Sequence, residues 1–195
     1  DYRSSRGLGD VYKRQSWILN VDIILNNSTF DFRRNFLNCI ISQTNHLKRN
    51  IGFESNLKKK VEILTAIILT GLVFKEYEEN FNIGIGELET LIKGFFDNDG
   101  FPLSRNPNDL IFFTKYLIFC RELIKDSQKY VPEFLQDIID KNLNCIHFIK
   151  TPDDQLPLFN GASAVNLKQI QKYLDEFKPK SKNNNLGGYY SYFLA

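Results

Sequence analysis

Residues 63–74 are apolar on nearly every side of the helix that their spacing predicts. A helix at the surface keeps a polar face, so a segment of this kind is expected to lie buried between neighbouring elements. Gly71 falls within the segment, where glycine costs about 1 kcal/mol relative to alanine. We therefore expect Gly71 to mark a close contact with another helix, inside a helix that spans residues 57–79.

Apolar residues recur at helical spacing through most of the remaining chain, and short polar loops separate the runs. Pro107 and Pro132 lie in first-turn positions, where their missing N–H has no helical partner to lose. The pattern predicts an all-α fold of antiparallel helical hairpins with short turns. We expect the tail of a helix within residues 16–27, helices at residues 30–50, 57–79, 86–96, 107–126, 132–150 and 164–177, a polar linker at 178–187 and a strand that begins at Gly188.

The composition fits one globular domain and gives no reason to expect nucleic acid as a partner. The 195 residues are 43% hydrophobic and include 17 Phe, enough to fill a core. Residues 1–15 resemble a translated sequencing adapter and are excluded from the fold prediction, as an expression scar would be. Without that segment, 21 basic and 21 acidic residues remain, so the chain is neutral rather than basic.

We expect the chain to be an internal part of a longer protein. The adapter-like segment hides the native N-terminus, so the lack of a signal peptide gives no information on the compartment. The last six residues read as a strand cut short, and no apolar run reaches the length of a membrane span. Cys39, Cys120 and Cys145 lie in helical apolar patterns and are expected to be reduced core residues, since no spacing indicates a disulfide framework or a zinc site.

A polar loop from Asp97 to Ile111 separates two of the predicted helices. Gly100 allows a left-handed turn, and Asn106 precedes Pro107 as the N-cap of the next helix. Such a loop can present polar groups to a ligand, although loops of this length are more often connectors. A second polar, Pro-rich loop spans residues 151–163.

Four stretches of the chain carry a resemblance to a known family, in the family's order and spacing. They are Phe32-Arg-Arg through Gln43-x-x-His-Leu-x-Arg-Asn50, Ala66-Ile-Ile-Leu-Thr-Gly-Leu-Val-Phe74, Asp99-Gly-Phe-Pro-Leu-Ser-Arg-Asn-Pro107 and Asp154-Gln-Leu-Pro-Leu-Phe-Asn-Gly161. With them, residues 16–195 resemble the N-terminal region of the heparinase II/III-like polysaccharide lyases. The resemblance implies an incomplete α/α toroid at residues 16–178, then a linker and the first strand of a truncated C-terminal β-sandwich at residues 179–195.

The chemistry that the resemblance implies is β-elimination on uronic-acid polysaccharides such as heparin or heparan sulfate. Such an enzyme neutralises the uronate carboxylate, removes the C5 proton and protonates the leaving oxygen. In the family, an Asn-His pair, a Tyr and a His of the β-sandwich do this. Here Lys58 and Lys59 occupy the Asn-His positions, and Asp109 occupies the Tyr position with Leu110 after it. A lysine could pair with the carboxylate as a point charge, and Asp109 could accept a proton.

Lys59 and Arg105 are two candidate substrate-binding residues, and each has a structural alternative. The run Lys58–Lys60 is typical of the solvated first turn of a helix. Arg105 could grip an acidic sugar, or it could pair with Asp97 or Asp99, since arginine suits both roles.

Asn160 is the third candidate for substrate binding, as a ligand to sugar hydroxyls. The alternative is a turn residue before Gly161, a position that asparagine favours. His46 and His147 fall within helical patterns, where a surface or hydrogen-bonded histidine is more common than a catalytic one. Most of the aromatic residues are expected in the core, and the remainder could stack on sugar rings.

Three functions follow from these patterns. The first is a lyase on acidic polysaccharides, active at full length and inactive in this part alone. The second is a non-catalytic relative that binds an acidic glycan, and the third is a helical scaffold for protein partners. No cofactor, metal or nucleic acid is expected, and the resemblance implies a periplasmic or exported bacterial protein.

Overall fold

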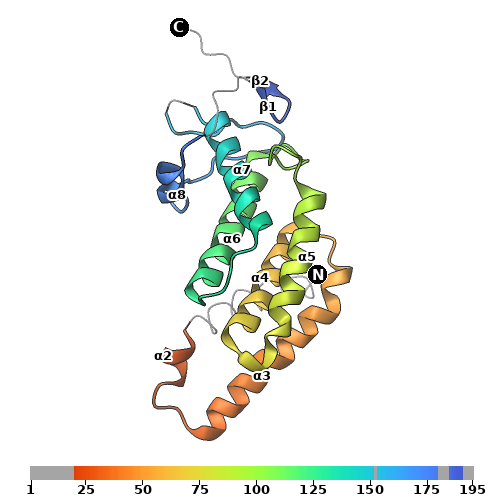
Figure 1. The fold of residues 1–195 in the computed structure, drawn as a ribbon, viewed down its shortest axis with the longest axis vertical. Helices are drawn as coiled ribbons and strands as arrows, with labels where there is room; N and C mark the ends of the chain where they lie inside the picture. The colour runs from red at the N-terminus through yellow and green to blue at the C-terminus, as the bar shows by residue number, and fades with distance from the viewer. Residues whose placement is uncertain (1–19, 152, 180–184, 191–195) are drawn as a thin grey trace. The chain divides into compact units, whose positions relative to one another are not determined.

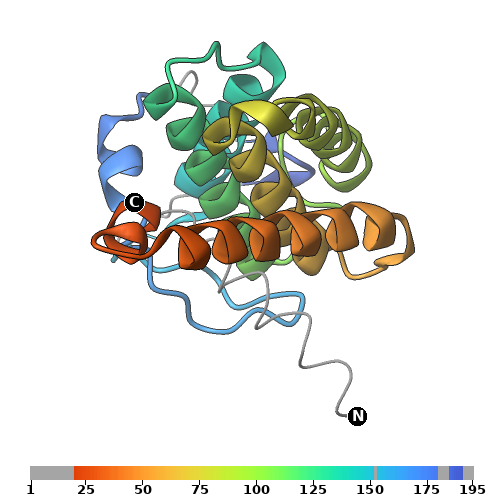
Figure 2. The ribbon, with the colours of Figure 1, turned by 90° about the horizontal axis from the view of Figure 1, so that it is seen from below.

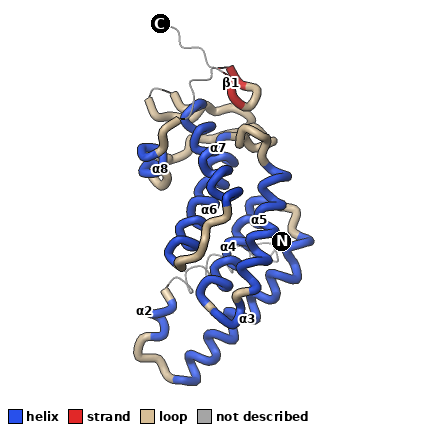
Figure 3. The backbone as a smooth tube through the Cα atoms, viewed as in Figure 1, coloured by secondary structure: helices blue, strands red, loops and turns tan. Residues whose placement is uncertain are grey.

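The computed structural model describes residues 20–151, 153–179 and 185–190. These residues are mostly helical, with seven α-helices and one small two-stranded sheet, which confirms the predicted all-α class (Figures 1 and 3). The chain divides into two compact units, residues 1–88 and residues 89–195. Within the described ranges, no helix is both long and apolar enough to cross a membrane.

The first unit is built from helices that pack side to side. Its elements are α2 (Val21–Leu25), α3 (Phe30–Asn50), α4 (Leu57–Val73), two short 3-10 helices (Ile51–Phe53 and Lys75–Tyr77) and the first half of α5 (Glu79–Phe95). Thr29 caps α3, where its hydroxyl accepts a hydrogen bond from the Phe32 N–H at 3.3 Å. Figure 2 shows α3 as the long helix that runs from red to orange, with the bounds that the sequence predicts.

Helix α4 is buried on all sides for three turns, as its composition predicts. Every residue from Val61 to Gly71 is buried, including Thr65 and Thr70, whose hydroxyls donate to carbonyl oxygens one turn earlier. Against α3, a core cluster forms from Leu47, Ile63, Ala66 and Ile67. Removal of this apolar surface from water is the main force that holds the first unit together.

Gly71 and Gly84 allow α4 and α5 to approach very closely. A Cβ atom on Gly71 would lie 2.2 Å from the backbone nitrogen of Phe81, and one on Gly84 would lie 2.6 Å from Cγ1 of Ile68. Real Cβ atoms do not reach such distances, so only glycine fits at either position. The close helix contact predicted at Gly71 is confirmed, and its partner is the next helix of the chain.

The predicted boundary between these two helices was wrong. Helix α4 ends at Val73 rather than at residue 79, and α5 begins at Glu79 rather than at residue 86. The chain turns through Phe74, which is extended, and through the 3-10 helix that follows it. Asn80 then anchors α5 to α3, because its buried side chain accepts a hydrogen bond from Nζ of Lys48 at 2.7 Å. A hydrogen bond between residues 32 positions apart cannot be predicted from the spacing of apolar residues.

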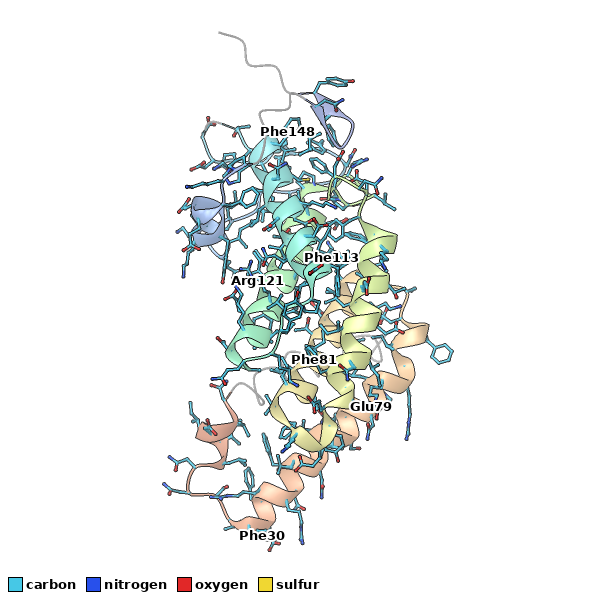
Figure 4. The ribbon with its side chains drawn as sticks, in the orientation of Figure 1. Phe30, Glu79, Phe81, Phe113, Arg121 and Phe148 are labelled. Carbon is cyan, nitrogen blue, oxygen red and sulfur yellow. The ribbon has the colours of Figure 1, made fainter. Side chains whose placement is uncertain are left out.

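The second unit contains the end of α5, helices α6 (Pro107–Asp126), α7 (Glu133–Ile149) and α8 (Gln171–Glu176), and strands β1 (Asn185–Leu186) and β2 (Tyr189–Tyr190). Asn106 caps α6 with Pro107 in the first turn, as predicted. Between α5 and α6, Phe95 stacks on Phe113 with ring centroids 4.0 Å apart (Figure 4). The predicted spans of α6 and α7 are confirmed to within one residue.

Two predictions for the end of the chain need correction. The helix expected at residues 164–177 is reduced to α8, because residues 164–167 are irregular and residues 168–170 form a turn, which together bury Leu167 and Ile170 without a helix. A strand follows Gly188 as expected, but residues 178–187 are not all linker, because β1 lies among them and pairs with β2 in a hairpin where Gly187 and Gly188 take positive φ angles. Residues 191–195, where the strand was expected to continue, lie outside the described ranges.

The three cysteines are free thiols, and one of them is not where the sequence predicts. Cys120 and Cys145 are fully buried, as expected for core residues. Cys39 is exposed, since it lies one position away from the buried stripe of α3 that Ile40 begins. The prediction for Cys39 was wrong because a one-residue shift moves a side chain about 100° around a helix.

Gly71→Ala is expected to lower the free energy of unfolding by about 2 kcal/mol, because the new methyl group overlaps the backbone of α5. The matched control is Gly86→Ala, in α5, where a Cβ atom meets nothing within 4 Å. The control should raise stability by up to about 1 kcal/mol through helix propensity. Urea unfolding followed by far-ultraviolet circular dichroism measures both, and equal effects would contradict the close contact.

Iodoacetamide is expected to alkylate Cys39 in the native protein and to spare Cys120 and Cys145. Burial raises the pKa of the Cys145 thiol, and the nearby carboxylates of Asp97 and Asp99 raise it further, so this thiol stays protonated and unreactive. Peptide mass spectrometry after labelling at neutral pH checks the pattern, and all three should react in urea. Rapid native labelling of Cys145 would show that its surroundings are more open than described.

Candidate functional site

Three segments that are distant in sequence meet in the second unit (Figure 1). Nδ2 of Asn106 donates to the carbonyl oxygen of Asn160 at 3.0 Å, and Nδ2 of Asn160 donates to the carbonyl oxygen of Arg105 at 3.1 Å. The backbone N–H of Gly187 donates to Oδ2 of Asp99 at 2.9 Å. We call residues 97–106, 153–163 and 185–190 the loop cluster. It contains both polar loops that the sequence singles out.

Asp97 closes the first loop of the cluster. Its Oδ1 accepts hydrogen bonds from the backbone N–H groups of Asp99 and Phe101, at 3.0 and 2.9 Å. Its Oδ2 forms an ion pair with Nη1 of Arg105 at 2.5 Å. One carboxylate therefore binds two backbone N–H groups and one guanidinium of the same loop. Hydrogen bonds to a charged acceptor are stronger than those between neutral groups.

The first loop is also fixed to α7. Gly100 has a φ angle of +93°, and a Cβ atom there would lie 2.5 Å from Cβ of Lys141. Sγ of Cys145 donates to the carbonyl oxygen of Asp99 at 3.2 Å. Asn142, in the amide orientation that suits its neighbours, donates to the carbonyl oxygen of Gly100 at 2.9 Å. The loop is thus a rigid part of the fold, and the left-handed turn predicted at Gly100 is confirmed.

Aromatic rings join the hairpin to both loops. The ring of Tyr189 lies 5.4 Å from that of Phe101 and 5.2 Å from that of Phe159. Gly187 sits directly on Phe101, since a Cβ atom there would lie 2.1 Å from the ring. Three large apolar side chains of the cluster are exposed, namely Leu103, Leu158 and Tyr190. Tyr190 is thus an exposed ring close to amide groups, and this chemistry suits a sugar, which offers C–H faces for packing and hydroxyls for hydrogen bonds.

Arg105 and Asn160 both stabilise the loop cluster through contacts within it. Arg105 pairs with Asp97, and its guanidinium lies 5.7 Å from the centre of the Phe101 ring. Asn160 takes a φ angle of +50° before Gly161 at +78°, so it is a turn residue. The structural alternatives given for these two residues are therefore confirmed.

Lys58 and Lys59 belong to the first unit, whereas the loop cluster consists of second-unit residues only. Their backbone N–H groups donate to Oδ1 of Asn56, which caps α4. Both side chains are half-buried, so the first turn of α4 is less solvated than a lysine run suggests. Asp109 lies in the first turn of α6, where its Oδ2 accepts a hydrogen bond from the Ser104 hydroxyl at 2.7 Å.

The two histidines have ordinary structural surroundings. Nε2 of His147 lies 2.9 Å from the carbonyl oxygen of Leu174, and the imidazole stacks on Phe177, so this residue ties α7 to α8. His46 is exposed on α3 beside Asn50. Within the described ranges, no three His, Cys, Asp or Glu residues are grouped as a metal site would need.

A cavity of about 240 Å³ adjoins the loop cluster at Asp97 and Asn98. Its apolar walls come from α5, from Phe96, which directly follows α5, and from α7, which supplies Phe134 and Ile138. Lys93 and Lys141 stand at its edge, each in an ion pair with a carboxylate of its own helix. The sequence alone does not reveal this cavity, because the packing of α5 against α7 cannot be predicted from the residues of either helix alone.

Comparison of the chain with family models, curated proteins and solved structures finds no match. The function is therefore inferred from the residues of the chain itself. Of the positions that the sequence singles out, the structure brings together Arg105, Asn160 and, through Ser104, Asp109. It adds Tyr189 and Tyr190, for which the Gly-Gly-Tyr-Tyr sequence was the available signal, and Phe159, which lies in the second polar loop.

Asp97→Ala is expected to lower the free energy of unfolding by about 2 kcal/mol, because two backbone N–H groups and Arg105 lose their shared acceptor. Asp97→Asn keeps one acceptor oxygen and should cost about half as much. Asp137→Ala removes an exposed ion pair with Lys141 and should change stability by less than about 0.5 kcal/mol. Urea unfolding of the three variants tests the order, and similar values for Asp97→Ala and Asp137→Ala would refute it.

Proposed function

We propose that this chain is the helical part of a polysaccharide-lyase-like protein that binds uronic-acid polysaccharides at the loop cluster. In this proposal the two units belong to an incomplete α/α toroid, and the complete site carries out β-elimination. One observation supports it above the others. The two loops with the family-like segments Asp99–Pro107 and Asp154–Gly161 are hydrogen-bonded to each other through Asn106 and Asn160, 54 residues apart. Segments that share a ligand have to lie together.

The surface chemistry of the cluster also suits a glycan. Tyr190 is 64% exposed and lies on the hairpin that Tyr189 packs against both loops. An exposed ring held by a rigid support can stack on a sugar at little entropic cost. The side chains of Asn106 and Asn160 place amide groups beside it.

A non-catalytic acidic-glycan-binding relative is the second candidate, and the ion pair of Arg105 favours it. Elimination needs a positive or donor group that can turn to the substrate carboxylate. Arg105 is neutralised by Asp97, and Lys58, Lys59 and Asp109 replace the catalytic residue types of the resembled family. In the catalytic version, Lys59 neutralises the carboxylate as a point charge.

The 195-residue protein is expected to bind heparan sulfate, alginate or hyaluronan in isothermal titration calorimetry. Tyr190→Ala should weaken binding about fivefold, because stacking on one aromatic ring is worth about 1 kcal/mol. Tyr130→Ala is the matched control, since Tyr130 is 74% exposed and lies outside the loop cluster. It should leave affinity unchanged.

Turnover separates the two candidates. Ultraviolet absorbance of unsaturated uronate is followed with this chain and with the longest reading frame that contains it. A rising signal that Lys59→Ala abolishes identifies a lyase, whereas binding without turnover identifies the non-catalytic relative. Absence of binding to every polymer rejects both and favours a scaffold for protein partners.

A further inference from the structure

A second cavity, of about 310 Å³, lies within the second unit and away from the residues of the loop cluster. Successive turns of α6 supply Lys115, Ile118, Phe119 and Glu122. The segment before α8 supplies Gln169 and Ile170, and α8 supplies Tyr173. The wall is mainly apolar, with two aromatic rings and few polar groups. Two of the lining residues, Lys115 and Glu122, are charged. Concave, mainly apolar sites of this size with a few polar groups are typical of small-molecule pockets.

Lys115 is the charged group whose surroundings need explanation. Among the described residues, neither a hydrogen bond nor an ion pair involves its ammonium group. Burial lowers the pKa of Lys115, and no neighbouring charge contributes to that shift. A partly desolvated cation without a counterion is unfavourable, and a bound anion would relieve the cost.

Glu122, the one carboxylate among the residues that line the cavity, is not paired with Lys115. Oε1 of Glu122 accepts from Nε of Arg121 at 2.8 Å and lies 3.7 Å from Nζ of Lys125. Arg121 is 8% exposed, and its guanidinium also lies 5.4 Å from the centre of the Tyr173 ring (Figure 4). Two cations thus pair with the one carboxylate, which leaves Lys115 without a counterion among the described residues, and the local charge favours an anionic ligand.

We propose that this cavity binds a small aromatic carboxylate, with the carboxylate at Nζ of Lys115 and the ring against Phe119 and Tyr173. The apolar wall selects a ligand with a hydrophobic body over a free inorganic anion, which would lose its hydration without replacement. The charge on Lys115 selects the carboxylate over its neutral amide. This site is independent of the glycan site, because none of its lining residues belongs to the loop cluster.

Benzoate and benzamide are the probes, because they have the same ring and nearly the same shape but differ in charge. Both are titrated into the ¹⁵N-labelled 195-residue protein and followed by heteronuclear NMR. Benzoate should bind about tenfold more tightly than benzamide, which corresponds to one compensated charge of about 1.4 kcal/mol. The amide signals that shift should include those of Gln169, Ile170 and Tyr173.

Lys115→Gln should lower benzoate affinity about tenfold, to the level of benzamide, and leave benzamide affinity unchanged. Lys172→Gln is the matched control, since Lys172 is exposed on α8 and does not line the cavity. It should leave benzoate affinity within about twofold. Phe119→Leu should weaken both probes by similar factors through the lost ring contact.

Equal binding of benzoate and benzamide to the unaltered protein would overturn the proposal. So would shifts spread over surface lysines rather than the cavity, or an unchanged benzoate affinity in Lys115→Gln. Because benzoate and benzamide are compared on the unaltered protein, the preference for a carboxylate is tested even if a variant does not fold.

Discussion

The carboxylate of Asp97 stabilises the loop cluster, for which a function is proposed. Asp97 accepts two backbone N–H groups and pairs with Arg105, which closes the loop and orients the Arg105 carbonyl toward Asn160. The same loop carries Phe101, on which the hairpin packs. Without this acceptor, the exposed N–H of Asp99 could turn to water, whereas the part-buried N–H of Phe101 would lose its partner, at a cost of about 1 kcal/mol or more. The second loop and the hairpin therefore depend on one side chain that neither of them contains.

This arrangement also determines what the loop cluster can recognise. The charge of Arg105 is compensated within the protein, so the outward face offers amides, backbone groups and the ring of Tyr190 rather than a bare cation. Such a surface recognises hydroxyls and ring faces, whereas the carboxylate of a uronate needs a donor or cation from elsewhere. Under the proposed function, different groups would therefore recognise the sugar and neutralise its charge.

The parts of the fold that local chemistry determines could be predicted. The cap at Asn106, the left-handed turn at Gly100 and the buried run of α4 each depend on residues within a few positions of one another. The predicted helix boundaries were wrong where contacts with residues far away in the sequence determine the local structure. Lys48 fixes the start of α5 through Asn80. Leu167 and Ile170 are buried by packing of an irregular segment, although their spacing resembles that of a helix.

The same distinction explains why residue type alone is a poor guide to the candidate sites. Arg105 lies in a polar loop and was a natural candidate to bind an acidic sugar, yet an aspartate eight positions earlier compensates it. Lys115 lies in an apolar helix with no motif around it, yet its ammonium group has no counterion among the described residues. A cation is available to a ligand when the fold supplies no counterion for it, and whether a counterion is supplied depends on how the helices pack. A charge that the fold has already neutralised contributes rigidity, whereas a charge left at an apolar cavity contributes affinity.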